Sequence, residues 1–183
     1  QRTLFDGGWA GITWPRRFGG RGGTPAQAVI FGEELAAFDA TSGFLASTID
    51  LVGPALLQHA NDAQRERYLR PLLRGDEVWC QLFSEPEAGS DLAALRTRAE
   101  RRGDEFVVNG QKLWTTGAQH CDFGILLART NPDVPKHRGI SFLLVDMRTP
   151  GIEVRPLVTI TGSRHFNEVF LADVRVPAEN VVG

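Results

Sequence analysis

The chain has 183 residues, of which 42% are hydrophobic and 23% charged, and this composition indicates a folded globular protein. Its formal net charge of -2 argues against a nucleic-acid partner, because such partners usually require a basic surface. The sequence shows no apolar run of membrane-spanning length and no basic segment followed by an apolar one at its start. We therefore expect a cytoplasmic protein without a membrane partner.

The first third of the chain predicts helices. A glycine-rich stretch at residues 5–23 lacks the Walker lysine and the G-x-G-x-x-G spacing of a phosphate cradle, so we interpret it as a connecting loop. Thr24 followed by Pro25 is a favourable helix start. Phe31, Leu35 and Phe38 then come at helical spacing, which predicts an amphipathic helix packed in a bundle.

Two further helical segments come next. An apolar stretch from about residue 44 to residue 57 is interrupted at Gly53-Pro54, where a proline would break or kink a helix. Asn61-Asp62 is a capping pair for a third helix, predicted from Ala63 to Leu69 and ending before Pro71. Gly75-Asp76 then marks a change from helical to strand periodicity.

Strands are predicted from Val78 onward. Short apolar runs with turn residues between them favour an antiparallel barrel or sandwich. The sequence thus predicts an α+β protein, with a partial all-helical domain at residues 1–77 and a β-domain at residues 78–183. After the first strand at 78–84, the predicted strands are 95–101, 105–109, 111–116, 123–129, 140–146, 152–158 and 167–176.

The segment Gln81 to Asp91 is the first candidate site. It continues an apolar run, and Pro86 and Gly89 then end the strand and shape the loop. With Ser84 on one side and Ala88-Gly89-Ser90 on the other, the loop allows a flat ligand to approach the main chain. A surface turn before a helix is the alternative interpretation of this segment alone.

A second segment, residues 109–117, begins with Asn109-Gly110, which predicts a hairpin turn before a strand ending in Trp114-Thr115-Thr116. Together the two segments resemble the acyl-CoA dehydrogenase family. Its middle domain carries a T/S-E-P-x-A-G-S-D loop and, after an N-G-x-K turn, a W-[I/T]-T strand. This chain has Ser84-Glu85-Pro86-Glu87-Ala88-Gly89-Ser90-Asp91, Asn109-Gly110-Gln111-Lys112 and Trp114-Thr115-Thr116.

The resemblance extends over nearly the whole chain, through residues 68–76, 138–145, 166–170 and 173–181. It implies that the helical C-terminal domain of the family would begin just after Gly183, and that the family's first helices would precede Gln1. Arg164, His165 and Phe166 differ from the residues that are most common in the family at these positions, which leaves the acyl specificity open.

The resemblance also implies an FAD cofactor and an acyl-CoA substrate. In this family a carboxylate base removes the α proton of a thioester while the β hydrogen passes as hydride to flavin N5. Carried over by motif, Ser84 is expected to bond the polar edge of the flavin, Trp114 to pack against the ring and Thr116 to reach toward N5. Ser90 is expected to contact both cofactor and substrate. The full set of expected cofactor-binding residues is Gln81, Phe83, Ser84, Gly89, Ser90, Trp114, Thr115 and Thr116.

Each of these residues also has a purely structural interpretation. Ser84 could bond its own backbone, Trp114 could be a core residue, and Thr115 and Thr116 could serve only as strand formers. It is their combination at family spacing that favours a flavin site. Four arginines at positions 96, 98, 101 and 102 could bind CoA phosphates, but alternating charge on a strand is more typical of a solvated face.

No catalytic residue is assigned within the chain. Glu85 and Asp91 belong to the loop and Glu168 to a strand, whereas the family resemblance places the base glutamate beyond Gly183. The fragment alone is therefore expected to be inactive. Cys80, Cys121 and the four histidines lack the spacing of metal ligands, and we expect no metal.

Three functional hypotheses remain open from the sequence. The first is an acyl-CoA dehydrogenase that passes electrons to an electron-transfer flavoprotein and forms a homodimer or homotetramer. The second is a flavin oxidase or monooxygenase on the same fold. The third is a non-catalytic subunit of a heteromeric acyl-CoA dehydrogenase.

Overall fold

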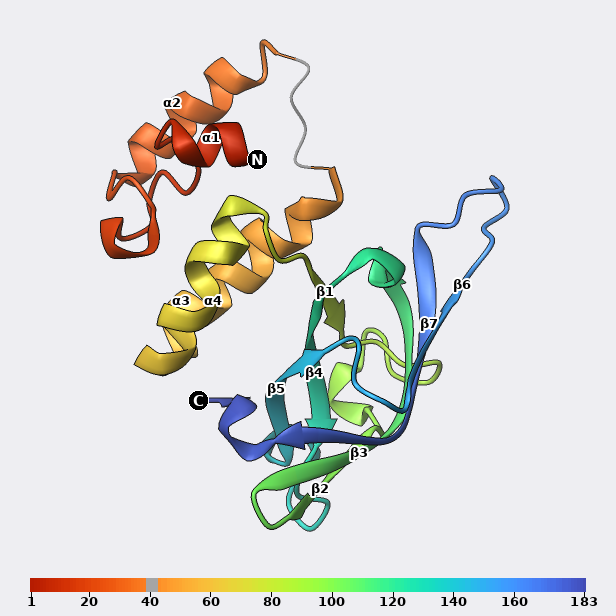
Figure 1. Ribbon diagram of the computed structural model, residues 1–183. Coiled ribbons are helices and arrows are strands. Elements are labelled where there is room, and N and C mark those ends of the chain that lie inside the picture. Colours follow the sequence, from red (N-terminus) through yellow and green to blue (C-terminus); the bar gives the residue numbers. More distant parts are fainter. Residues whose placement is uncertain (39–42) are drawn as a thin grey trace. The chain divides into compact units, whose positions relative to one another are not determined.

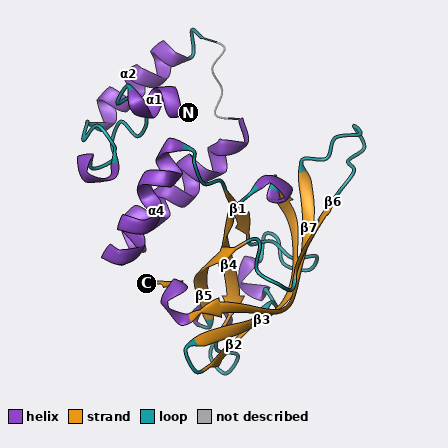
Figure 2. Ribbon diagram, in the orientation of Figure 1, coloured by secondary structure: helices purple, strands orange, loops and turns teal. Residues whose placement is uncertain are grey.

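The computed structural model describes residues 1–38 and 43–183 of the chain. These residues form two compact units, Gln1–Val78 and Trp79–Gly183 (Figure 1). The first unit is helical, and the second is built on strands joined by loops and short 3₁₀ turns (Figure 2). The helices are α1 (Arg2–Asp6), α2 (Pro25–Leu35), α3 (Gly53–His59) and α4 (Asp62–Arg74).

Helix α4 organises the first unit. Asn61 and Gln64 cap it reciprocally, each side chain accepting a hydrogen bond from the backbone N–H of the other. Its Leu69, Leu72 and Leu73 are fully buried. The helix was predicted to end before Pro71 but continues to Arg74, which corrects that expectation. Burial of the two leucines after Pro71 outweighs the backbone hydrogen bond that the proline loses.

Helix α2 starts as predicted, since Thr24 accepts a hydrogen bond from the Gln27 N–H. Its packing is partial: Phe31 stacks on Trp9, with the ring centroids 5.7 Å apart. No residue of α2 is buried among the described residues, and Phe38 lies beyond the helix with 70% of its surface exposed. The interruption predicted at Gly53-Pro54 is present, because a π-helix at Ser47–Val52 gives way there to α3.

The second unit contains one eight-stranded sheet. Seven strands lie in the order β6-β7-β3-β2-β4-β5-β8, and β1 pairs with β4. The α+β class is therefore confirmed. The sheet is mixed rather than purely antiparallel, because β1 and β2 each pair in parallel with β4. The strands are β1 (Trp79–Leu82), β2 (Arg98–Arg102), β3 (Glu105–Thr116), β4 (Phe123–Arg129), β5 (Ile140–Asp146), β6 (Ile152–Pro156), β7 (Phe166–Pro177) and β8 (Val181–Val182).

One core supports this sheet, and it is made of apolar side chains from both ends of the unit's sequence. Leu82 of β1, Val108 of β3, Leu126 of β4, Leu143 of β5 and Val169 of β7 are all completely buried within it. Strands β1 and β3 therefore pack in the same core. This shared packing is important for the site, because one candidate segment comes directly after β1 and the other ends β3.

The predicted hairpin turn at Asn109-Gly110 is wrong. Strand β3 runs without interruption through both residues, and the chain turns earlier, at Gly103. Asn109 instead exchanges hydrogen bonds with Asp173 across the ladder, where β7 holds one extra residue and Asp173 has a positive φ of 51°. Gly110 is required by crowding, since a Cβ there would lie 2.7 Å from the Cα of Thr97. The Asn-Gly pair therefore serves a β-bulge and a close backbone approach.

Candidate functional site

The loop after β1 is a compact turn attached to β3. Glu85 and Ala88 exchange two backbone hydrogen bonds of 3.0 and 3.1 Å across Pro86 and Glu87. Just before the turn, the carbonyl oxygen of Ser84 accepts a hydrogen bond of 2.8 Å from the Leu113 N–H. The two candidate segments of the sequence therefore meet directly, through backbone contact between Ser84 and the residue that precedes Trp114.

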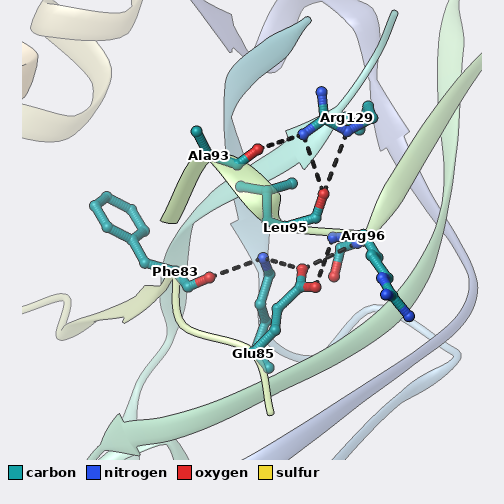
Figure 3. Close-up of polar contacts among 8 residues, drawn as sticks. Phe83, Glu85, Ala93, Leu95, Arg96 and Arg129 are labelled. Carbon is teal, nitrogen blue, oxygen red and sulfur yellow. Dashed lines mark hydrogen bonds and ion pairs between the residues drawn. The ribbon is translucent and has the colours of Figure 1, made fainter. Parts of the chain in front are cut away.

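A buried ion pair joins the same two segments. Lys112 has no exposed side-chain surface, and its Nζ donates to Glu85 Oε1 at 2.8 Å and to the Phe83 carbonyl oxygen at 3.0 Å. The Glu85 carboxylate also accepts hydrogen bonds from the backbone N–H groups of Arg96, at 2.6 Å, and Thr97, at 2.9 Å. Figure 3 shows Glu85 directed toward Arg96 on one side, with Phe83 nearby. The carboxylate thus connects three stretches of chain.

Burial and pairing act in opposite directions on both groups. Burial favours the neutral form of Glu85, but the hydrogen bonds from Lys112 and the neighbouring backbone outweigh it and lower the pKa of the carboxyl below its ordinary value. Burial lowers the pKa of Lys112, and the hydrogen bond to Glu85 opposes this change without cancelling it. Glu85 is therefore a carboxylate at neutral pH, and its charge is compensated.

The end of the loop has its own anchor. The guanidinium of Arg129, on β4, donates to the carbonyl oxygen of Ala93 at 2.7 Å and to that of Leu95 at 3.2 Å. These contacts are visible in Figure 3. The loop from Ser84 to Arg96 is thus held at its beginning by Lys112 and at its end by Arg129.

A second β-bulge shapes the end of β3. Three steps along β3, from Lys112 to Thr115, lie opposite two steps of β7, from Val169 to Asn167, and Trp114 has a positive φ of 59°. Strict alternation would place Lys112 and Trp114 on the same face of the strand. The extra residue instead leaves Lys112 buried and exposes 56% of Trp114. Non-glycine residues with positive φ are strained and cluster at functional sites.

The side chains around Trp114 are divided between surface and interior. Phe166 packs edge-on against the Trp114 ring, with the ring centroids 5.7 Å apart. Thr116 is exposed, whereas Thr115 is buried, and its Oγ1 has no hydrogen-bond partner among the described residues. The Thr115 carbonyl accepts a hydrogen bond of 2.9 Å from Asn167 Nδ2. Trp114 and Thr116 therefore form an outer surface, and Thr115 lies behind it.

The remaining predicted residues, Gln81, Phe83, Gly89 and Ser90, differ in their exposure and contacts. Gln81 is the one exposed residue of β1, and Phe83 is half-buried with its ring edge-on to Phe142, 6.3 Å between centroids. Gly89 and Ser90 are exposed farther along the loop, and a Cβ at Gly89 would meet no atom within 4 Å. The structure thus joins Ser84 to the Trp114 segment directly and leaves Gly89 and Ser90 open to a ligand.

The structural role of Lys112 was not predicted from the sequence, where this residue was considered only as part of the Asn109-Gly110-Gln111-Lys112 motif. The signal was present, because a lysine inside an apolar strand and a glutamate in the partner motif are opposite charges that burial requires to pair. The four arginines at positions 96, 98, 101 and 102 are exposed. Three of them pair with glutamates: Arg96 with Glu87 at 2.8 Å, and Arg98 and Arg102 each with Glu100 at 3.7 Å. Within residues 1–38 and 43–183, no cluster of His, Cys, Asp or Glu side chains could hold a metal ion. No helix among those residues is long and apolar enough to cross a membrane.

Comparison with known proteins identifies the family. The sequence model described as "Acyl-CoA dehydrogenase, middle domain" matches residues 80–174, and the one described as "Acyl-CoA dehydrogenase, N-terminal domain" matches residues 1–76. The chain belongs to the acyl-CoA dehydrogenase family. The resemblance inferred from the two motifs is thereby confirmed.

Individual acyl-CoA dehydrogenases are similar over the full chain. Acyl-CoA dehydrogenase FadE34 of Mycobacterium tuberculosis is 48% identical over 188 residues, which cover 100% of this chain and 26% of FadE34. The solved ChsE4-ChsE5 complex from Mycobacterium tuberculosis has a TM-score of 0.87 at 40% identity, covering 100% of this chain and 46% of that one. A glutaryl-CoA dehydrogenase from Mycobacterium smegmatis, solved in complex with FADH2, has a TM-score of 0.79 at 26% identity, covering 98% and 46%. The chain thus spans half or less of the length of these relatives.

Proposed function

We propose that the chain supplies part of the flavin and substrate site of an enzyme that catalyses FAD-dependent α,β-dehydrogenation of an acyl-CoA thioester. Membership of the acyl-CoA dehydrogenase family supports the reaction class, and the relative solved with FADH2 supports the cofactor. The observation that carries the proposal for this chain is the β3 bulge, which exposes Trp114 next to the segment that holds Ser84.

The residues present fit a flavin. A flat ring system needs an apolar face and polar groups at its edge. Trp114 offers an exposed aromatic face, and the open surface around Gly89 leaves room for a ligand close to the main chain. Bound FAD would supply a hydride acceptor that no amino-acid side chain can replace.

Each of the expected cofactor-binding residues has a defined role in this proposal. Trp114 would pack against the ring, and the Ser84 hydroxyl would bond the polar edge of the flavin, where a hydrogen-bond donor stabilises negative charge. Thr116 would bond the ring near N5, and Ser90 would contact both the cofactor and the thioester arm of the substrate. The remaining expected residues, Gln81, Phe83, Gly89 and Thr115, shape the surface. Thr115 does so through its backbone in the bulge, because its side chain is buried.

The base that removes the α proton is proposed to be a glutamate outside residues 1–183. Glu85 cannot serve, because its carboxylate is buried and accepts three hydrogen bonds within the chain. A base must reach the proton that it abstracts. We further propose a cytoplasmic homodimer or homotetramer that passes electrons to an electron-transfer flavoprotein.

A non-catalytic subunit is the second candidate. It is favoured by the similarity to the ChsE4-ChsE5 complex, in which two different chains assemble. In that case the chain would keep the fold while a partner chain completed the active site.

The test is the visible absorption spectrum of the protein expressed from the complete coding sequence, recorded before and after anaerobic addition of mixed acyl-CoA thioesters. A flavin spectrum that bleaches on addition supports the dehydrogenase. A flavin spectrum that does not bleach points to an incomplete active site and favours the non-catalytic subunit. A colourless protein that takes up no added FAD refutes the proposed function.

A further inference from the structure

The contacts around Ser84 converge on a single buried pair. Phe83 and Glu85, the two neighbours of Ser84, both accept hydrogen bonds from Lys112 Nζ, at 3.0 and 2.8 Å. The Ser84 carbonyl accepts a third bond from Leu113, the residue next to Lys112. Three consecutive residues after β1 are thus bonded to two consecutive residues of β3.

These bonds lie directly beside the bulged end of β3. Trp114, two residues after Lys112 in the chain, lies in the bulge with a positive φ. A bulged strand end lacks the regular ladder that would otherwise fix its alignment. The Lys112 contacts come immediately before the irregular stretch and hold its start against the end of β1.

Stability is a weak reason for burying these charges. Replacing a buried ion pair by apolar groups of similar size is often neutral or stabilising, because desolvation offsets most of the attraction. A charged pair is, however, directional. The Lys112 ammonium is held between one carbonyl and one carboxylate, and the carboxylate is fixed in turn by the backbone N–H groups of Arg96 and Thr97.

We propose that Lys112 and Glu85 are positioning residues that set the placement of Ser84 relative to Trp114. This inference rests on the proposed flavin function, because it concerns the geometry of that site. Binding groups must be held within about 0.5 Å of their productive positions by supporting contacts. Loss of the pair releases the segment after β1, residues 83–85, from β3 and lets Ser84 move relative to Trp114.

The decisive variant is the double substitution Glu85→Gln with Lys112→Met in the protein expressed from the complete coding sequence. It removes both charges together, so that neither is left buried without a partner. The amide oxygen of the introduced glutamine can replace one of the two carboxylate oxygens that accept from the Arg96 and Thr97 N–H groups. The matched control is Glu153→Gln with Arg155→Met, which removes an exposed ion pair of 2.8 Å on β6.

Three quantities are measured for each protein: the urea denaturation midpoint, the FAD dissociation constant and the position of the visible flavin absorption maximum. The expected result is a folded double variant whose FAD dissociation constant rises about tenfold, which corresponds to about 1.4 kcal/mol. Its absorption maximum is also displaced, because the groups at the polar edge of the flavin have moved. The control variant is expected to match the wild type in both flavin readouts.

A folded double variant with the dissociation constant and spectrum of the wild type overturns the inference and leaves the proposed function intact. A wild-type protein that binds no FAD overturns both. If the double variant does not fold, the single substitution Lys112→Arg carries the test, because it keeps a positive charge beside Glu85 while changing the geometry of the donor groups. Wild-type flavin readouts in that variant would then overturn the inference.

Discussion

Removing one partner of the buried ion pair is predicted to destabilise the second unit strongly. Lys112→Met leaves Glu85, with 7% of its side-chain surface exposed, as a buried carboxylate that keeps two backbone hydrogen bonds but loses its counter-charge. The Phe83 carbonyl also loses its bond from Nζ. Breaking a buried pair in this way costs about 3–5 kcal/mol. A domain has only about 5–15 kcal/mol of stability, so the loss is large on that scale.

The assay is urea denaturation followed by far-UV circular dichroism, with Lys136→Met as the matched control. Lys136 also loses an ion pair, the 2.6 Å contact with Asp91, but its side chain is 49% exposed. Exposed pairs contribute about 0–1 kcal/mol. A loss below about 1 kcal/mol in Lys112→Met, or equal losses in the two variants, would show that Glu85 is not a buried charge dependent on Lys112.

Three further predictions concern the backbone and pH. Gly110→Ala should lower the free energy of unfolding, measured by urea denaturation, by about 1–3 kcal/mol, because the new Cβ would overlap the Thr97 backbone. The control Gly32→Ala lies in α2 with open space around it and should leave the free energy of unfolding unchanged or raise it. Equal effects of the two substitutions would contradict the crowding at Gly110. The Trp114→Gly variant should have a free energy of unfolding about 1 kcal/mol higher than that of Trp114→Ala, because glycine adopts the positive φ of this position without strain. Equal stability of the two variants would argue against the bulge. Because folding lowers the pKa of Glu85, its carboxylate contributes fully to the free energy of unfolding at pH values above 4.5, the ordinary pKa of a glutamate. This contribution is lost as the pH falls through the pKa of the folded state. The stability gap between wild type and Glu85→Gln should therefore shrink from pH 7 to pH 3, and a gap that widens would reverse the sign of the assigned shift.

The sequence predicted the features that depend on local pattern. The helix start at Thr24, the strand at β4 and the strand at β7 result from capping and alternation, and the family is indicated by two motifs at fixed spacing. Such features are determined by neighbours along the chain, so they can be read before the fold is known.

The features that it missed depend on contacts distant in sequence. Asn109-Gly110 has the composition of a hairpin turn, but its contacts with Asp173 on β7 and with Thr97, just before β2, make it part of a continuous strand. Pro71 marks a helix end by local rules, yet buried leucines keep the helix intact. Likewise, alternation cannot foresee the bulge that separates Lys112 from Trp114, because the extra residue is defined only by its pairing with β7.

The most direct test of the flavin assignment is an FAD titration of the protein expressed from the complete coding sequence, comparing Trp114→Ala with Trp9→Ala. The two tryptophans are exposed to similar extents, 56% and 45%, but Trp9 belongs to the helical unit and not to the sheet that carries the proposed flavin residues. Loss of an aromatic face is worth about 1.4 kcal/mol, or a factor of ten in affinity. The account predicts about tenfold weaker FAD binding for Trp114→Ala and unchanged binding for Trp9→Ala. Wild-type affinity in Trp114→Ala would contradict the placement of the flavin against β3.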